Sequence, residues 1–343
     1  MHYTRWSRLQ STLAVFLTPL SWIFGFCLKV RHHAYDQGWL LAYRPKAFTI
    51  SVGGIEAGGS GKTPITAYLL QKLLQQNKKV GLLSRGYGRS SRGLIKREQG
   101  EKANATKHGD EPTLLLNRYA DVPAAICAKR RFGAKYLSEI GCQIIVCDDA
   151  FSHRGLQRDL DIVVLRDEAP LADGYLLPRG HLRESPKRLT RAHLIWLHQK
   201  SAQSKSSTSA ELSAILAAQK VVRSTSRLTL KHPNGSPVHY CGQDVVAVAG
   251  IAHPQSFYDM LQELELNILD FMAFADHCPY QAKERQKIQA SLAKHKGSVL
   301  VMTAKDYVKM PQDWCPGQIW IADLDICVLE GEEHLNSLLK TAA

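Results

Sequence analysis

The sequence predicts an α/β protein with a mainly parallel β-sheet that helices cover on both faces. Short apolar runs of strand length alternate along the chain with segments in which apolar residues recur at helical spacing. A glycine-rich turn separates the first strand pattern from the first helix pattern, and a second group of such patterns follows beyond residue 240. This alternation favours parallel strands, because helical crossovers between them place helices on the faces of the sheet.

The first part of the chain supplies most of the strand patterns. Strands are predicted at residues 47–52, 80–83, 144–147, 162–165 and 194–197, and helices at 62–78, 112–118 and 129–140. Ser, Gln, Lys and Ala dominate from Gln199 to Ser213, which is typical of a solvated linker or the start of a surface helix. We therefore predict a core domain at residues 41–210 and a smaller domain at residues 211–343.

The smaller domain begins with a predicted β-ribbon. The strand-like runs 221–230 and 237–241 flank Pro233-Asn234-Gly235, and Asn-Gly between two such runs is a strong hairpin signal. Further strand and helix patterns lie at residues 245–249, 256–264, 299–303 and 319–322. They predict a second α/β unit that the ribbon connects to the first.

Residues 1–40 are predicted to form a membrane-associating helix. The segment Leu13–Leu28 is almost wholly apolar and is flanked by basic residues, but it is shorter than the roughly 20 apolar residues that a span needs, and Pro19 interrupts it. These features suit a helix lying in the membrane interface. A buried core helix and a cleaved signal peptide are the alternatives, although no small-residue cleavage site follows the apolar run.

Composition narrows the partners and the compartment. Lys+Arg 44 against Asp+Glu 31 gives a net charge of +13, which favours anions such as nucleotides, acidic lipids and phosphorylated substrates. With no zinc-knuckle spacing and no aromatic RNA-binding signature, we expect no nucleic-acid partner, and no obligate protein partner is predicted. The eight cysteines, Cys315 among them, are scattered without a CxxC pair, which indicates a reducing compartment.

A phosphate-binding loop is the strongest local motif. The segment Gly53–Pro64 follows a strand and opens a helix, and its glycines let backbone N–H groups approach phosphates at a helix N-terminus. The predicted nucleotide-binding residues are Ala57, Gly58, Gly59, Ser60, Gly61, Lys62 and Thr63. Glu56 stands where the strict motif has glycine, and we expect its carboxylate to face out of the loop because it would repel a triphosphate. The core is therefore predicted to be a P-loop NTPase-type sheet that binds ATP.

Two aspartates follow the strand at residues 144–147. In P-loop enzymes an apolar strand that ends in Asp holds Mg²⁺ opposite the threonine of the loop. Thr63, Asp148 and Asp149 are therefore the predicted magnesium ligands, although a carboxylate at a strand end is often only a structural cap.

Seven motifs in a fixed order resemble one known family. They are AGGSGKTP, HGDEP at residues 108–112, DDAFSHRGLQRD at 148–159, LLPRGHLRE at 176–184, VAGIAHP at 248–254, DHCPY at 276–280 and MTAKDYVK at 302–309. In this order they resemble the tetraacyldisaccharide 4′-kinases. The resemblance implies that ATP phosphorylates the 4′-hydroxyl of the lipid A disaccharide 1-phosphate precursor, an acylated glucosamine disaccharide. It also implies a peripheral or monotopic place on inner-membrane lipid, at the cytoplasmic face of the bacterial inner membrane.

The resemblance also assigns catalytic roles. It makes Asp110 the candidate general base with His277 beside it, and it makes Asp276 the residue that orients the imidazole. Lys62 and Asp149 complete the predicted catalytic set. Without the resemblance, Asp110 would be interpreted as a helix N-cap and His277 as one of 14 histidines. Which of Asp110 and His277 takes the proton stays open.

Two basic segments offer surfaces for an acidic glycolipid head group. Residues 85–97 are predicted to form a mobile basic loop, in which Tyr87 is a candidate for stacking on a sugar, and residues 179–191 are the second segment. A solvated basic face is the equal alternative.

The chain departs from the family pattern at Glu56, Ala150, Ser152 and His253. We expect Ala150 to be tolerated if its backbone angles are ordinary, and we expect Ser152 to lose a polar contact. The alternative function is a P-loop NTPase switch or a metallochaperone-type ATPase at the membrane, which would hydrolyse nucleotide without a lipid acceptor.

Overall fold

The computed structural model describes residues 2–199, 210–311, 313–314 and 316–341, and it describes side chains from Phe16 onward except at Ala210 and Glu211. Most of the predicted linker at 199–213 therefore lies outside the described residues, as does Cys315. The other seven cysteines are free thiols.

The described strands form one mixed sheet that is mainly parallel, as predicted. Its strands lie in the order β10-β9-β11-β12-β8-β7-β6-β1-β5-β2-β4-β3. Their bounds are β1 Phe48–Gly53, β2 Val80–Ser84, β3 Ile95–Arg97, β4 Ala124–Ile126, β5 Ile144–Asp148, β6 Leu160–Arg166, β7 Leu194–Gln199, β8 Val221–Lys231, β9 Asp244–Ala249, β10 Asn267–Ala273, β11 Val299–Thr303 and β12 Ile319–Glu330. Only the pairs β3/β4 and β8/β12 are antiparallel.

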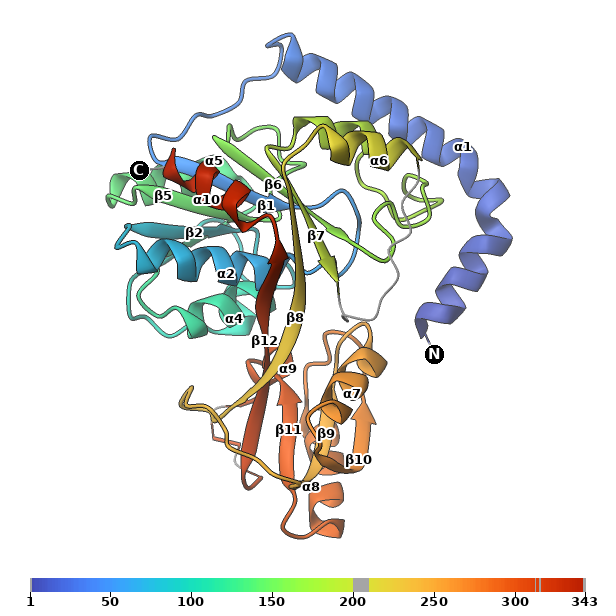
Figure 1. Cartoon of the computed structure of the whole chain (residues 1–343), viewed down its shortest axis with the longest axis vertical. Helices are drawn as coiled ribbons and strands as arrows, with labels where there is room; N and C mark the ends of the chain where they lie inside the picture. The colour runs from blue at the N-terminus through green and yellow to red at the C-terminus, as the bar shows by residue number, and fades with distance from the viewer. Residues whose placement is uncertain (1, 200–209, 312, 315, 342–343) are drawn as a thin grey trace.

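The helices surround this sheet in two lobes, with β8 and β12 running from one lobe to the other (Figure 1). Their bounds are α1 His2–Asp36, α2 Lys62–Gln75, α3 Ala105–His108, α4 Asp110–Arg118, α5 Arg130–Glu139, the 3-10 helix η1 Pro186–Arg191, α6 Ala210–Ala217, α7 Pro254–Gln262, α8 Ala282–Lys294, α9 Ala304–Tyr307 and α10 Glu332–Lys340. The predicted helix at 62–78 ends early, because Asn77 adopts a positive φ of 56°.

Alternate residues of the central strands pack on opposite faces of the larger lobe. Ile50 and Val52 of β1 share a core with Leu69 of α2, whereas Ile145 of β5 packs with Leu137 of α5. Both faces are therefore covered, as the near-continuous apolar strands predicted.

The predicted hairpin forms its turn but almost none of its strand pairing. The turn at Pro233-Asn234-Gly235 forms, but only one bridge, from Lys231 to Pro237, continues it. The long antiparallel partner of β8 is instead β12, whose residues 321–330 pair with residues 223–231. Lys231 is bridged to both Ile321 and Pro237, so β12 and the start of the hairpin lie on opposite edges of β8, and Pro237, which lacks a backbone N–H, does not extend the hairpin ladder.

The last helix packs back onto the larger lobe. Leu335 and Leu339 of α10 are buried in the core that contains Ile50 and Leu69. The smaller lobe has its own cores on the two faces of β9 and β11, represented by Phe257 and by Tyr280. The domain division at residues 1–40, 41–210 and 211–343 stays a prediction, and any such division has to accommodate the position of α10.

Helix α1 lies along the surface of the larger lobe rather than in its core (Figure 1). Ser21 and His32 face the body, where Ser21 Oγ donates to the carbonyl of Leu176 at 2.8 Å and His32 Nε2 lies 2.7 Å from Glu184 Oε2. Large apolar side chains cover the other face, with Trp22 72% and Phe26 67% exposed. The buried-core alternative is therefore wrong for the described side chains of this helix. No helix among the described residues meets the length and hydropathy of a membrane span.

The packing of α10 predicts a large stability effect. Leu335→Ala should lower the free energy of unfolding by about 2–5 kcal/mol, because Leu335 is fully buried and its removal leaves a cavity. Urea denaturation followed by circular dichroism measures the change. Leu329→Ala is the matched control, since Leu329 is 55% exposed and should change stability little. Equal effects of the two substitutions would contradict this packing.

Candidate active site

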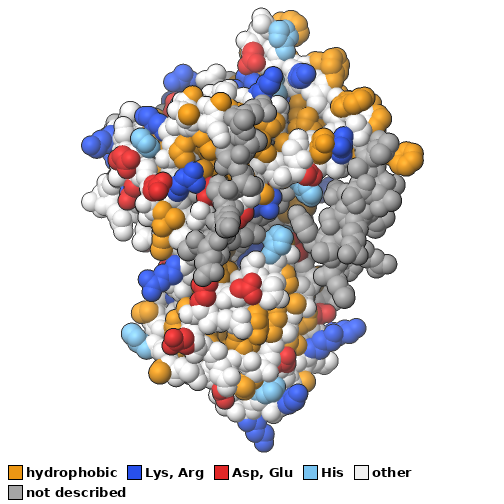
Figure 2. All heavy atoms as spheres, turned by 45° about the vertical axis from the view of Figure 1, so that its right-hand side comes forward, with side chains coloured by type: hydrophobic (Ala, Val, Ile, Leu, Met, Phe, Trp, Pro, Cys, Tyr) orange, Lys and Arg blue, Asp and Glu red, His pale blue; other side chains and the backbone are white. Residues whose placement is uncertain are grey.

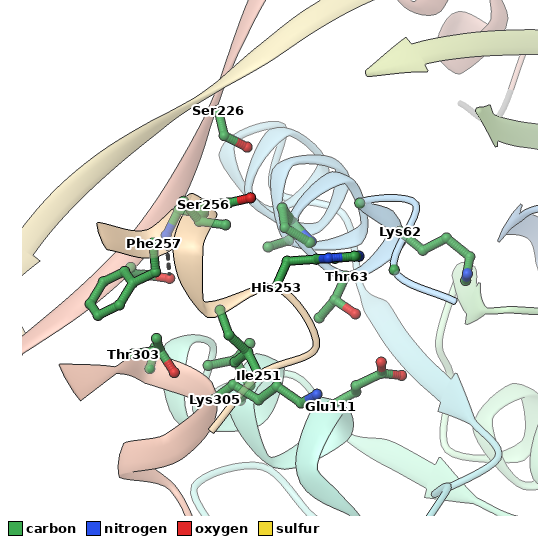
Figure 3. Close-up of a pocket in the computed structure, with 18 of the residues that line it drawn as sticks. Lys62, Thr63, Glu111, Ser226, Ile251, His253, Ser256, Phe257, Thr303 and Lys305 are labelled. Atoms are coloured by element: carbon green, nitrogen blue, oxygen red, sulfur yellow. Dashed lines mark hydrogen bonds between the residues drawn. The ribbon is translucent and has the colours of Figure 1, made fainter. Parts of the chain in front are cut away.

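A cavity of about 310 Å³ lies between the two lobes. The larger lobe contributes Gly58–Thr63 and Glu111, and the smaller lobe contributes His253 and Lys305. Figure 3 shows Thr63 of α2, Glu111 of α4, Lys305 of α9 and His253 of the turn before α7 around this cavity, whereas the side chain of Lys62 points away from them. Part of the lining is apolar, including Leu228, Ile251, Phe257, Met260 and Leu324. The residues of the predicted phosphate loop therefore face a real cavity.

The local backbone of the loop requires glycine at Gly61. This residue precedes α2 with a φ of 85°, and a Cβ placed there would lie 2.5 Å from Cδ2 of His198. The N-terminus of α2 therefore opens directly into the cavity, with Lys62 and Thr63 as its first residues. Lys62 Nζ donates to the carbonyl of Gly58 and to Ser60 Oγ, both at 3.3 Å. A helix N-terminus with a lysine and exposed loop N–H groups is suited to an anion.

Glu56 does not line the cavity, and its side chain turns into the protein beside Arg166 rather than into solvent. Its side chain is buried, and its Oε2 atom accepts a hydrogen bond from Nε of Arg166 at 3.0 Å. Burial raises the pKa of Glu56, and the opposing charges of Arg166 and Lys62 do not fully offset this effect. The carboxylate is therefore both outside the cavity lining and paired with an arginine.

Asp148 lies at the end of β5 below the phosphate loop. It is 2% exposed, and its Oδ1 atom has no hydrogen-bond partner within the described residues. Burial raises the pKa of Asp148, and the negative charges of Glu111 and Asp149 raise it further. A buried carboxylate with an unpaired oxygen is suited to meeting a cation.

Within the described residues, Asp149 forms an ion pair with an arginine, whereas Asp148 does not. Its two carboxylate oxygens each lie 2.8 Å from a guanidinium nitrogen of Arg183. Burial opposes ionisation of Asp149, but this pairing and the charge of Lys62 lower its pKa to about 2. Arg130 fixes the same turn by donating to the carbonyls of Asp148 and Asp149 at 2.7 and 3.2 Å.

Asp110 and His277 meet across the two lobes. Nδ1 of His277 lies 2.8 Å from Oδ2 of Asp110, although the residues are 167 positions apart. Asp110 is the first residue of α4, and Gly109 occupies the N-cap position, so the N-cap interpretation of Asp110 is wrong. Asp276 Oδ1 accepts from the backbone N–H of His277 and from Lys305 Nζ, both at 3.0 Å. Asp110 rather than Asp276 therefore makes the close contact with the imidazole.

The charge state of Asp110 follows from its neighbours. Burial alone would raise the pKa of Asp110, but the hydrogen bond to His277 and the charges of Lys309 and Lys305 lower it. An ionised carboxylate can only accept, so Nδ1 of His277 carries the hydrogen of this bond. His277 holds a φ of 59°, a strained conformation that the bonds of its backbone and ring maintain.

The predicted lipid-binding segments are only partly exposed. Tyr87 is 74% exposed, and its ring centroid lies 6.2 Å from that of His277, so it stands at the mouth of the site. Arg97 is buried in β3 and donates to the carbonyls of Ala120 and Val122, which excludes it from head-group binding. In the second segment Arg183 is paired with Asp149.

The departures from the family pattern have different surroundings. Ala150 is buried and is absent from the residues with positive φ, so its backbone is ordinary, as expected. Ser152 Oγ is buried without a partner in the described part of the chain, which fits the expected loss of a polar contact. His253 lines the cavity and precedes α7 (Figure 3).

Glu111, Lys305 and Arg166 line the cavity but were not among the site residues predicted from the sequence. Glu111 lies next to Asp110 in the HGDEP motif, and Lys305 lies within MTAKDYVK, so both residues belong to motifs that the sequence itself reveals. Arg166 belongs to no such motif, because a single arginine at the end of a strand carries no pattern.

The fold and the site together define an α/β protein in which a glycine-rich loop before a helix opens into a cavity between two lobes, and a carboxylate–imidazole pair joins the same two lobes. A family model described as tetraacyldisaccharide-1-P 4′-kinase matches residues 13–343. The chain belongs to this family.

Individual relatives agree with this assignment. A tetraacyldisaccharide 4′-kinase of Haemophilus influenzae is 32% identical over 96% of this chain and 93% of its own length. One of Shewanella halifaxensis is 35% identical over 90% of this chain and 88% of its own length. The crystal structure of LpxK from Aquifex aeolicus in complex with ATP is similar with a TM-score of 0.80 at 27% identity, covering 97% of this chain and 99% of that one.

The geometry of Gly61 predicts a sharp contrast between two glycines. Gly61→Ala should lower the free energy of unfolding by at least about 1 kcal/mol, because a Cβ in the left-handed region is strained and meets His198. Gly59→Ala is the matched control, since a Cβ there meets nothing within 4 Å. Urea denaturation of both variants measures the difference. Equal stability of the two would contradict the backbone described for the loop.

Proposed function

We propose that this chain transfers the γ-phosphoryl group of ATP to the 4′-hydroxyl of the lipid A disaccharide 1-phosphate precursor. The observation that carries the proposal is the Asp110–His277 pair, because Glu111 beside Asp110 and Lys305, 3.4 Å from His277 Nε2, line the same cavity as the loop of Lys62. Membership of a kinase family supports the same reaction. ATP is the nucleotide in the complex of the Aquifex relative.

The phosphate loop is proposed to bind the triphosphate. The backbone N–H groups of Gly58–Thr63 and the positive end of α2 suit its charge, and Lys62 is placed to reach the β and γ oxygens. Most of the acceleration in phosphoryl transfer comes from positioning and charge neutralisation of this kind.

The residues present fit a magnesium ion. Thr63 and Glu111 line the cavity, and Asp148 contributes the buried oxygen that lacks a protein partner. No group of three acidic, His or Cys ligands occurs among the described residues, but Mg²⁺ usually takes one or two carboxylates together with phosphates and water. Thr63, Asp148 and Glu111 would hold the ion, and the bidentate pair with Arg183 makes Asp149 a weaker candidate ligand than the sequence suggested. When bound, the ion neutralises charge on the β and γ phosphates.

Asp110 is proposed to accept the proton of the acceptor hydroxyl. Nδ1 of His277 already donates to Asp110, and Nε2 lies 3.4 Å from Nζ of Lys305. The carboxylate is therefore the better-placed acceptor, and His277 orients it. Asp276 is proposed to act through Lys305 and through the backbone of His277.

Helix α1 is proposed to hold the enzyme on the cytoplasmic face of the inner membrane. Exposed apolar residues gather along α1 and the segment after it, including Phe16, Trp22, Phe26, Trp39 and Leu41. Figure 2 shows orange side chains collected along its upper right edge, where α1 runs. An apolar face of this kind favours burial in a lipid surface, where the acyl chains of the substrate reside. The alternative of a switch NTPase has no comparable support, because the matching family is a kinase family.

Substitution of Asp110 tests the chemical step. Asp110→Asn should lower kcat for lipid phosphorylation by about 10²–10⁴-fold and leave KM for ATP nearly unchanged, because it removes the proton acceptor but not the phosphate loop. Transfer of labelled γ-phosphate to the disaccharide 1-phosphate in detergent measures both constants. Lys62→Ala is the contrasting variant and should raise KM for ATP. Unchanged kcat in Asp110→Asn would exclude Asp110 as the base.

Two substitutions on α1 test the membrane surface. Trp22→Asp/Phe26→Asp should reduce the fraction of protein that floats with anionic vesicles by at least about tenfold, because each aromatic side chain gains about 1.5–3 kcal/mol on burial. Leu329→Asp, on a different exposed site, is the control and should float like the parent. Equal flotation of all three proteins would place the membrane contact elsewhere.

A further inference from the structure

Glu56 lies within the predicted phosphate loop, and its carboxylate pairs with Arg166. Its side chain is 3% exposed, and its Oε2 atom lies 3.0 Å from Nε and 2.9 Å from Nη2 of Arg166. The loop is held from the other side, because Glu56 forms a β-bridge with Leu182 and the N–H of Ala57 donates to the carbonyl of His181. The carboxylate is therefore fixed beside the guanidinium.

Arg166 is the last residue of β6, which lies beside β1 on the side opposite β5. The chain leaves β1 toward β2 and β5 and later returns to β6, so the strand order reverses between β1 and β6. Ligands of open α/β sheets bind at the carboxyl ends of strands at such a switch point. The structure agrees, because Arg166 lines the same cavity as Gly58–Lys62.

One nitrogen of the Arg166 guanidinium is available to donate to a ligand. Its side chain is 25% exposed, and Nη1 has no hydrogen-bond partner within the described residues. Because the guanidinium is a planar fork of five donors, Nε and Nη2 can hold Glu56 while Nη1 meets another oxygen. The carboxylate also prevents this buried end of Arg166 from being an uncompensated cation. Arg166 thus combines a paired guanidinium with a place in the lining of the cavity.

We infer that Arg166 binds a phosphate oxygen of the nucleotide and that Glu56 positions its guanidinium for this contact. The inference rests on the proposed function, because it assigns a further ligand-binding residue to the same nucleotide site. Arg166 touches the ligand, whereas Glu56 acts only through Arg166.

Nucleotide binding without lipid acceptor tests the inference. Dissociation constants of ATP, ADP and AMP are measured by calorimetry for the parent, Arg166→Met, Glu56→Gln and the double variant Arg166→Met/Glu56→Gln. Loss of one charge-assisted hydrogen bond to phosphate should weaken ATP and ADP about 10- to 100-fold in Arg166→Met and weaken AMP less. Lys135→Met is the matched control, since Lys135 is a surface cation on α5 and should bind all three nucleotides like the parent.

The double variant separates positioning from folding. It removes both charges, so it leaves no unpaired buried carboxylate, and its melting temperature without nucleotide reports folding. We expect it to fold and to bind ATP as weakly as Arg166→Met, because Glu56 has no effect once Arg166 is gone. Glu56→Gln alone should weaken ATP less than Arg166→Met does. A folded double variant that binds ATP like the parent would overturn the inference and make the pair purely structural.

The same assay separates this inference from the proposed function. If the parent binds no ATP and labels no lipid, the proposed function fails. If the parent does both and the double variant retains the parent's affinity for ATP, only the role of Arg166 fails.

Discussion

The site depends on one contact, the 2.8 Å hydrogen bond between Asp110 and His277. Asp110 begins a helix of the larger lobe, and His277 lies on a loop of the smaller lobe, so the pair exists only while the lobes stay together. Other bonds support the same closure, since Arg118 of α4 pairs with Asp323 and Asp325 of the ribbon strand β12. The arrangement of the lobes is thus a condition for the chemistry as well as for packing.

At the edge of the sheet where β1, β5 and β6 end, two carboxylates are paired with arginines. Burial alone would disfavour every carboxylate there, but Asp149 is paired with Arg183 and Glu56 with Arg166. Asp148 differs because no arginine pairs with its carboxylate in the described structure, where its Oδ1 atom, like Oε1 of Glu56, is buried without a hydrogen-bond partner. Asp149 and Glu56 therefore organise the site through their arginines, whereas Asp148 is the carboxylate best suited to bind a cation.

Much of the fold follows from local pattern. Apolar runs located β1, β2, β5, β6 and β7, because a strand buried on both faces is nearly continuous in apolar residues. Short or half-buried strands carried less signal, so β3, β4 and β10 were not predicted. The hairpin failed for a different reason: the turn was recognised correctly, but a turn cannot reveal that the long antiparallel partner of β8 is the distant strand β12.

The sequence by itself predicted a phosphate loop between β1 and α2, because the chemistry of such a loop needs consecutive residues at fixed spacing between a strand and a helix. It also located Asp148 and Asp149 at a strand end, and the order of seven motifs identified the family. Only the tertiary structure decided that Glu56 is buried against Arg166, that Asp149 is paired with Arg183, and that α1 turns an apolar face outward. These contacts join residues that are far apart in the chain. The periodicity of a segment predicts only the helix or strand that the segment itself forms, so it cannot predict such contacts.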